Sequence, residues 1–222
     1  MNYGSIRYII GWILKVEAAL MTLPMIVSVV YREKTGVYFV MAALLCLGAG
    51  VLLSMKKPEK TTYYAKEGYI SVALGWIVMS IMGCLPFVFS GEIPFFFDAL
   101  FEIISGFTTT GASILTDVEA LSKCMLFWRS FSHWVGGMGV LVFILAILPL
   151  AGGEHNLQLM KAESPGPSVS KLVPRLRETA MMLYKIYLGM TVLMIVILAV
   201  SGMPLFDTLC LTFGTAGTGG FG

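Results

Sequence analysis

The stretch FDALFEIISGFTTTGAS, residues 97–113, is apolar at its start and polar at its end. Its last nine residues, SGFTTTGAS, contain five hydroxyl-bearing residues and two glycines. An apolar stretch of about 10–14 residues is too short to cross a membrane and is typical of a re-entrant or buried segment. Polar backbone at membrane depth must be hydrogen-bonded, buried in protein or facing a water-filled cavity. The stretch therefore predicts a short helix followed by a segment that turns back.

The composition of the whole chain is that of an integral membrane protein. Of its 222 residues, 57% are hydrophobic and 13% are charged, and the mean hydropathy is +0.85. Soluble domains have about 45–50% apolar and about 25% charged residues. The net charge of +2, with no basic stripe, argues against nucleic acid as a partner. The four cysteines are widely spaced without a CxxC pair, which argues against a disulfide or a metal site.

Five apolar segments are long enough to span a bilayer, for which about 20 residues are needed. They are residues 5–31, 36–55, 69–90, 121–150 and 179–201. Two shorter stretches, residues 94–107 and 204–213, do not qualify and are predicted to be re-entrant. Lysine and arginine are concentrated in the connections after the second and fourth segments, so these connections and the N-terminus are predicted to be cytoplasmic. Both short stretches then enter from the outer face.

The opening stretch recurs near the end of the chain as FDTLCLTFGTAGTGGFG, residues 206–222, in a gapless alignment. The identical pairs include Thr109 with Thr218 and Gly111 with Gly220. Internal repeats are common in membrane transporters. Glycine reaches backbone angles that other residues adopt only at a cost, and backbone carbonyls beside it can replace the water around a monovalent cation. The repeat therefore predicts two loops that coordinate a cation.

Charged residues inside the apolar segments are costly in lipid and are predicted to face protein. They include Lys15 and Glu17 in the first segment and Arg129 in the fourth. Arg129 lies either near a pore mouth or beside a carboxylate such as Glu102 of the adjacent short helix, and we favour the pairing because it would hold that helix in place.

No catalytic constellation is visible, and the chain is predicted not to be an enzyme. Residues 217–222 match GxGxxG literally, but an apolar re-entrant segment precedes them where a dinucleotide site needs a strand. His133 and His155 are too isolated for a metal site. Asp98 and Asp207, at the starts of the short stretches, are predicted to cap free N–H groups.

Three motifs, in order along the chain, carry a family resemblance. SGFTTTGAS is followed by FWRSFSHWVGGMGV, residues 127–140, and by KAESPGP, residues 161–167. Over essentially its whole length the chain resembles the TrkH branch of the TrkH/KtrB/HKT potassium-uptake proteins. The resemblance implies an all-α membrane protein, in which two N-terminal helices precede four helix–re-entrant pore loop–helix repeats of potassium-channel type around one pore. The implied domains are residues 1–67 for the two N-terminal helices, 68–152 for the first repeat with its pore helix at 94–107 and filter at 108–113, 153–178 for a cytoplasmic linker, and 179–222 for a second, incomplete repeat.

The resemblance also implies a potassium filter with one key glycine per repeat. These glycines are Gly111 and, by the gapless alignment, Gly220, with Gly219 as the alternative one residue earlier. The neighbouring residues that would donate carbonyls to K⁺, the transported ion, are Thr109, Thr110, Thr218 and Gly219. No other metal or cofactor is expected on this chain.

The implied function is potassium uptake through a pore in the bacterial inner membrane, driven by the membrane potential. One alternative is sodium-coupled potassium symport. Another is a non-conducting, truncated fragment, because the family pattern requires two further repeats after residue 222. The resemblance implies a homodimer in the lipid bilayer and a cytoplasmic TrkA-like regulatory subunit with nucleotide-binding RCK domains.

Overall fold

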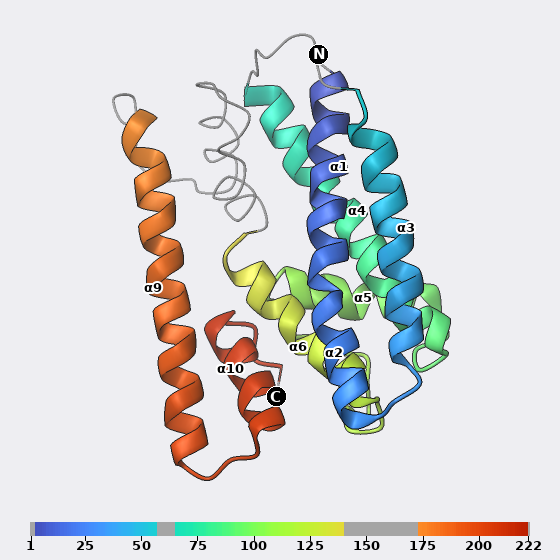
Figure 1. The fold of residues 1–222 in the computed structure, drawn as a ribbon, viewed down its shortest axis with the longest axis vertical. Helices are drawn as coiled ribbons and strands as arrows, with labels where there is room; N and C mark the ends of the chain where they lie inside the picture. The colour runs from blue at the N-terminus through green and yellow to red at the C-terminus, as the bar shows by residue number, and fades with distance from the viewer. Residues whose placement is uncertain (1–2, 57–64, 140–172, 222) are drawn as a thin grey trace.

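The computed structural model of the protein describes residues 3–56, 65–139 and 173–221, and all regular structure in these ranges is helical. Four of the described segments are long and apolar enough to cross a membrane. These candidate spans are Tyr3–Tyr31, Gly36–Ser54, Gly68–Ser90 and Met181–Val200. The long helices run along the length of the molecule, whereas the short helices α5, α6 and α10 lie in the half away from the N-terminus (Figure 1).

The first predicted span consists of two helices, α1 (Tyr3–Leu20) and α2 (Thr22–Tyr31), that break at Met21. Pro24, in the first turn of α2, has no N–H to donate to the carbonyl four residues earlier, which favours the break. Glu17 of α1 is 1% exposed, as predicted for a charge that must face protein. Lys15 is half-buried, with its ammonium 4.7 Å from the centre of the Trp12 ring.

The helix α3 (Gly36–Ser54) packs along α1 through a contact between two glycines. A Cβ atom built on Gly50 would lie 2.8 Å from the carbonyl oxygen of Gly11, and one built on Gly11 would lie 2.8 Å from the carbonyl oxygen of Gly50. Small residues allow transmembrane helices to approach closely where no hydrophobic effect drives them together. The two glycines thus set the distance between α1 and α3.

We expect Gly50→Ala to lower the free energy of unfolding by about 1–3 kcal/mol, because the added methyl group must push the two backbones apart. Thermal unfolding in detergent measures the change. Gly48→Ala is the matched control on the same helix, since a Cβ at Gly48 has nothing within 4 Å. Equal melting temperatures for the two variants would show that the contact does not limit the packing of α1 on α3.

The helix α4 (Ala65–Ser90) leads to α5 (Phe96–Phe107), the first short helix, and a loop then leads to α6 (Lys123–Gly137). Two carboxylates from other connections hold the N-terminus of α6. Glu33 accepts hydrogen bonds from the N–H groups of Lys123 (2.7 Å) and Cys124 (3.0 Å). Glu92 accepts from the N–H (2.9 Å) and the hydroxyl (2.7 Å) of Ser122. Negative charge is favourable at this end of a helix, so the α2–α3 and α4–α5 connections anchor α6.

The fourth predicted span, residues 121–150, was expected to be one long helix, and this expectation is wrong at residue 137. The helix α6 ends at Gly137, and Gly139 takes a left-handed φ of 67°. The N–H of Gly139 donates to the carbonyl of Gly136 at 2.9 Å. Glycine adopts left-handed angles without steric cost and commonly ends helices in this way. Residues 140–150 lie outside the described ranges.

The helix α9 (Val173–Val200) begins six residues before the predicted position 179. Its Pro174 lies in the first turn, where a missing N–H costs no hydrogen bond. Most of the predicted linker, residues 153–172, lies outside the described ranges. The helix α10 (Leu205–Ala216) follows α9, so α5 and α10 both begin on the side opposite to the N-terminus (Figure 1).

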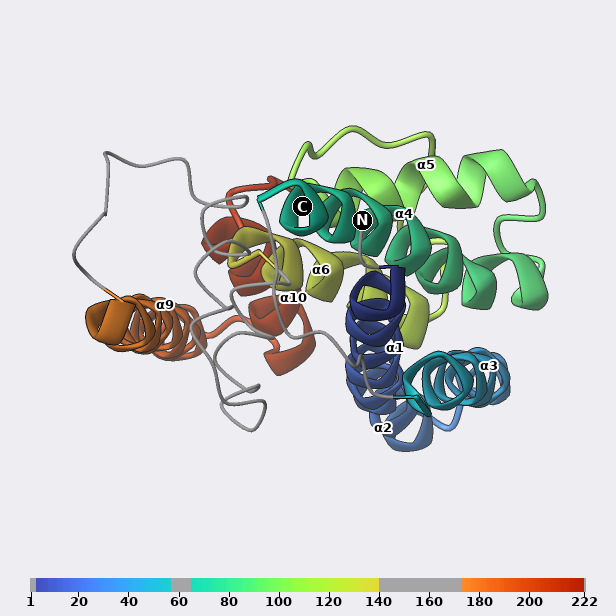
Figure 2. The same ribbon diagram turned by 90° about the horizontal axis from the view of Figure 1, so that it is seen from above.

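The core is aromatic and gathers around α6, which lies between α4 and α5 on one side and α10 on the other when the molecule is seen from above (Figure 2). The buried ring of Trp128 contacts the rings of Phe39 and Phe107, at centroid distances of 6.1 and 6.2 Å. On the other side of α6, Phe131 contacts Phe213 of α10 at 5.3 Å. These contacts place α6 between the two short helices.

The helix α9 is joined to this core through Trp134 of α6. The indole N–H of Trp134 donates to the hydroxyl of Thr191 at 3.1 Å, and the Trp134 carbonyl accepts from the hydroxyl of Tyr187 at 2.9 Å. Two hydrogen bonds thus connect α9 to α6.

Candidate functional site

The two short helices end in the same pattern of backbone hydrogen bonds. At the end of α5, the N–H of Thr109 donates to Gly106 (3.0 Å) and the N–H of Thr110 donates to Ser105 (2.9 Å). These two bonds form the Schellman pattern of helix ends. The end of α10 repeats them at the offset of the sequence alignment, with Thr218 donating to Thr215 (3.0 Å) and Gly219 to Gly214 (3.0 Å).

Left-handed residues also recur at the same two positions of each turn. Thr109 and Thr218 have φ values of 53° and 58°, and Gly111 and Gly220 have φ values of 75° and 78°. Glycine adopts this region freely, but for a β-branched residue such as threonine it is a strained outlier of the kind found at functional sites. The backbone therefore favours Gly220, rather than Gly219, as the counterpart of Gly111. Whether these residues hold an ion stays a prediction.

The backbone carbonyl groups of both turns accept no hydrogen bond within the part of the chain that the structure describes. The N–H groups of Thr109 and Thr110 are bound to the end of α5, yet no hydrogen bond between described residues ends on a carbonyl oxygen of residues 109–111 or 218–220. Carbonyl oxygens at membrane depth need water, protein or an ion as a partner. The two turns can therefore coordinate a cation through oxygen, whereas most of their N–H groups are already bonded to the ends of α5 and α10.

The two turns lie against each other although they are far apart in sequence. A Cβ atom built on Gly111 would overlap the carbonyl oxygen of Gly219. The structure thus brings together the two segments that contain the candidate residues, namely Thr109, Thr110 and Gly111 after α5 and Thr218, Gly219 and Gly220 after α10.

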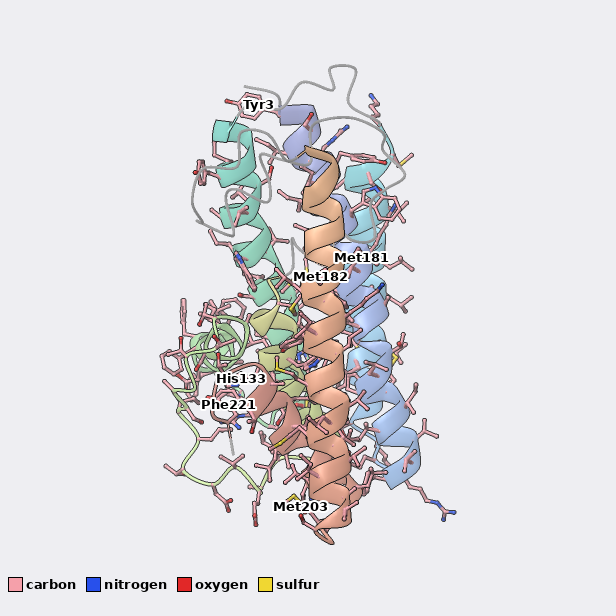
Figure 3. The ribbon with its side chains drawn as sticks, turned by 90° about the vertical axis from the view of Figure 1, so that its left-hand side faces the viewer. Tyr3, His133, Met181, Met182, Met203 and Phe221 are labelled. Carbon is pink, nitrogen blue, oxygen red and sulfur yellow. The ribbon has the colours of Figure 1, made fainter. Side chains whose placement is uncertain are left out.

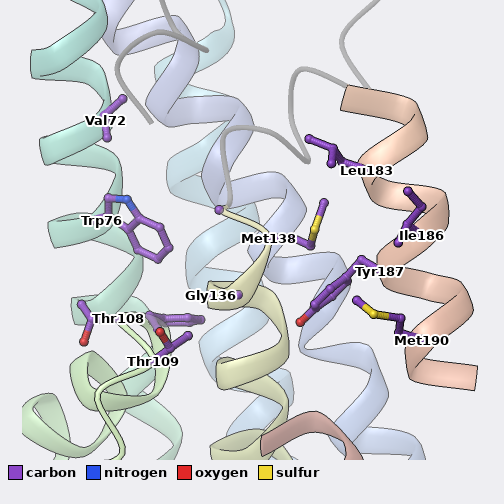
Figure 4. A pocket seen from close by; sticks show the side chains of 13 residues that line it. Val72, Trp76, Thr108, Thr109, Gly136, Met138, Leu183, Ile186, Tyr187 and Met190 are labelled. Carbon is purple, nitrogen blue, oxygen red and sulfur yellow. The ribbon is translucent and has the colours of Figure 1, made fainter. Parts of the chain in front are cut away.

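A cavity of about 690 Å³ lies beside the first turn (Figure 4). Thr108 and Thr109 line one end of it, and its walls come from α4, the end of α6 and α9. Val72 and Trp76 lie in the N-terminal half of α4, and the lining residues from α9, Leu183, Ile186, Tyr187 and Met190, lie around the middle of that helix. The cavity therefore extends from the first turn toward the side of the molecule where the N-terminus lies.

A buried ion pair supports the segment that follows the first turn. The Nε atom of Arg129 lies 2.6 Å from Oε1 of Glu102, and their side chains are 5% and 0% exposed. The same carboxylate accepts hydrogen bonds from the hydroxyl of Ser113 (2.8 Å) and from the N–H of Ile114 (3.0 Å). The predicted pairing of Arg129 with Glu102 is confirmed, and it holds the returning chain as well as α5.

The residues that support the second turn were missed by the sequence analysis. Phe221, directly after Gly220, is 4% exposed. The guanidinium of Arg129 lies 3.4 Å from the centre of its ring. The ring of His133 stacks on Phe221 with a centroid distance of 3.8 Å, and the two lie together in the lower half of Figure 3. The motif HWVGGMG contains His133, but nothing in its spacing indicates a contact with residue 221.

Asp98 and Asp207 are not the helix caps that the sequence predicted. The N-cap residues of α5 and α10 are Phe95 and Pro204, and the two aspartates lie within the first turns. Their negative charge still stabilises the N-terminal ends of α5 and α10, where the helix dipole is positive. The described residues contain no cluster of His, Cys, Asp or Glu that could hold a metal ion.

Residues 36–222 match the family model TrkH, described as a cation transport protein. The chain belongs to the TrkH family. Along its entire length it is 39% identical to the Trk system potassium uptake protein TrkH of Salmonella typhimurium and 35% identical to the Trk system potassium uptake protein TrkG of Escherichia coli K12. It covers 46% and 47% of these two proteins, so it spans about half the length of the curated relatives that it matches.

The crystal structure of the potassium transporter TrkH from Vibrio parahaemolyticus has the same fold. It superposes with a TM-score of 0.76 at 32% sequence identity, over 96% of this chain and 42% of that one. The predicted fold class is confirmed: the TrkH-family chain is an all-α membrane protein in which two N-terminal spans, α1 with α2 and then α3, precede pore-loop repeats. The two relatives are named as Trk system potassium uptake proteins and the solved structure as a potassium transporter, and these names describe transport and not an enzyme.

Proposed function

We propose that this TrkH-family chain forms two filter segments of a pore through which potassium enters the cell across the inner membrane. The observation that carries the proposal is the repeated turn after α5 and α10. In both turns left-handed residues lie at matching positions, and the carbonyl oxygens accept no hydrogen bond from a described residue. A membrane potential supplies about 2.3 kcal/mol per charge per 100 mV. Ion entry then needs no covalent chemistry.

The proposed ligands of K⁺ are the backbone carbonyls of residues 109–111 and 218–220. Backbone carbonyls replace the hydration shell of potassium in channel filters. Both short helices also direct their C-terminal, partly negative ends toward these turns. Charge and ligand type therefore both favour a cation.

The proposed orientation has the N-terminus in the cytoplasm. Its support is the excess of lysine and arginine in the connections after the second and fourth predicted spans. The cavity beside Thr109 then lies on the cytoplasmic side of the first turn. Resemblance to the family supports assembly as a homodimer and regulation by a nucleotide-binding subunit with RCK domains.

Transport in proteoliposomes tests the proposal, using the protein expressed from its complete gene. An imposed potential, negative inside, should drive potassium uptake that stops when the potential is collapsed. Uptake that requires external sodium would support the alternative of sodium-coupled symport. An absence of potassium uptake, both with and without sodium, would contradict the proposed pore and would support the alternative of a non-conducting chain.

A further inference from the structure

The side chain of Arg129 serves both filter segments at once. Its Nε atom is paired with Glu102, which binds Ser113 and Ile114 in the chain returning from the first turn. Its guanidinium also covers the ring of Phe221, which directly follows the second turn. Arg129 cannot leave one of these partners without moving relative to the other, so it couples the positions of the two segments.

His133 lies one helical turn further along α6 and backs the second segment. Its ring is fully buried and stacks on Phe221. A Cβ atom built on Gly219 would overlap this ring, so the imidazole fills the space directly behind Gly219. Neither ring nitrogen has a hydrogen-bond partner among the described residues. Packing against Phe221 and Gly219, rather than hydrogen bonding, therefore positions the ring.

The backbone of α6 also touches the ends of both short helices. A Cβ built on Gly136 would overlap the carbonyl of Phe107, the last residue of α5. A Cβ built on Gly137 would lie 2.7 Å from the Cα of Gly217, where α10 ends. The distance between the two filter segments is thus set by one rigid element that contacts both.

We propose that Arg129 and His133 are positioning residues that fix the spacing of the two filter segments, by holding Phe221 between their side chains while Glu102 holds the returning chain of the first segment. The inference rests on the proposed function. A carbonyl filter discriminates between ions through the number and placement of its oxygens. Loosening Phe221 therefore changes ion preference more than it changes the ability to conduct.

Phe221→Leu tests the proposal, because leucine fills much of the space but offers no ring to Arg129 and His133. In proteoliposomes containing the protein from its complete gene, we expect the ratio of potassium to sodium uptake to fall about 5–30-fold, the factor that corresponds to loss of a buried cation–π contact. Potassium uptake itself should persist. Phe221→Tyr keeps the ring and should restore most of the ratio.

Phe131→Leu is the control for general loosening of the core. Phe131 is two residues from both Arg129 and His133 and therefore lies on the opposite face of α6. Its buried ring contacts Trp134 of the same helix and Phe213 of α10. We expect this substitution to lower the melting temperature and to leave the ion ratio unchanged. His133→Leu removes the stacking of the imidazole on Phe221 and should also lower the ratio of potassium to sodium uptake.

A wild-type ratio in both Phe221→Leu and His133→Leu would overturn the inference, and so would an equal fall in Phe131→Leu. Failure of the wild-type protein to take up potassium would instead overturn the proposed function. The two failures are therefore distinguishable in one set of measurements.

Discussion

Gly111→Ser should remove most of the potassium uptake and most of the preference for potassium over sodium. The φ of 75° at Gly111 costs a residue with a side chain about 1–2 kcal/mol. The new Cβ would also overlap the carbonyl oxygen of Gly219, so one of the two filter segments must move. We expect uptake to fall about tenfold or more, measured as initial rates of K⁺ and Na⁺ entry into proteoliposomes.

Gly91→Ser separates backbone strain from filter geometry. Gly91 has a φ of 76° in the α4–α5 connection, and a Cβ built there has nothing within 4 Å. This variant takes the same strain as Gly111→Ser without the collision, so its uptake and ion ratio should stay near those of the wild type. Gly220→Ser, with a φ of 78° and no collision, should be intermediate. Equal losses of potassium uptake in Gly91→Ser and Gly111→Ser would show that backbone strain, and not the geometry of the filter, causes the effect.

The turn after α5 could be predicted from sequence because its causes are local. A short apolar run, a following polar segment and a glycine at a fixed distance are all contained in residues 97–113. Their recurrence at 206–222 then predicted the second turn, and the matching φ values show that the likeness extends to the backbone. The Arg129–Glu102 pair was predictable for a different reason, since two charges in apolar segments each require a partner.

The support of the second turn could not be predicted in this way. Phe221 meets Arg129 and His133 because α6 lies between α5 and α10, and this arrangement depends on tertiary packing that no local pattern encodes. The end of α6 was missed because hydropathy continues past Gly137, although the GGMG sequence carried the signal for a helix end. Pro24 likewise indicated the break between α1 and α2 that hydropathy does not detect.

Arg129→Met should lower the free energy of unfolding by about 3–5 kcal/mol, because removing one partner leaves the Glu102 carboxylate buried without a counter-charge. Glu102 would keep its hydrogen bonds from Ser113 and Ile114, which do not replace a positive charge. Unfolding in detergent, followed by heat or denaturant, measures the loss. Little change in stability would show that water reaches Glu102 and that the pair is not isolated as the structure indicates.

The double variant Glu102→Gln/Arg129→Met distinguishes the two roles of Arg129. A neutral amide needs no counter-charge, and replacing a whole buried ion pair with neutral groups is often nearly neutral for stability. We therefore expect most of the lost stability to return, with a coupling energy that a double-mutant cycle measures. Ion preference should not return, because methionine offers Phe221 no cation. A double variant as unstable as Arg129→Met would show that the hydrogen bonds of Arg129, and not its charge, stabilise this part of the protein.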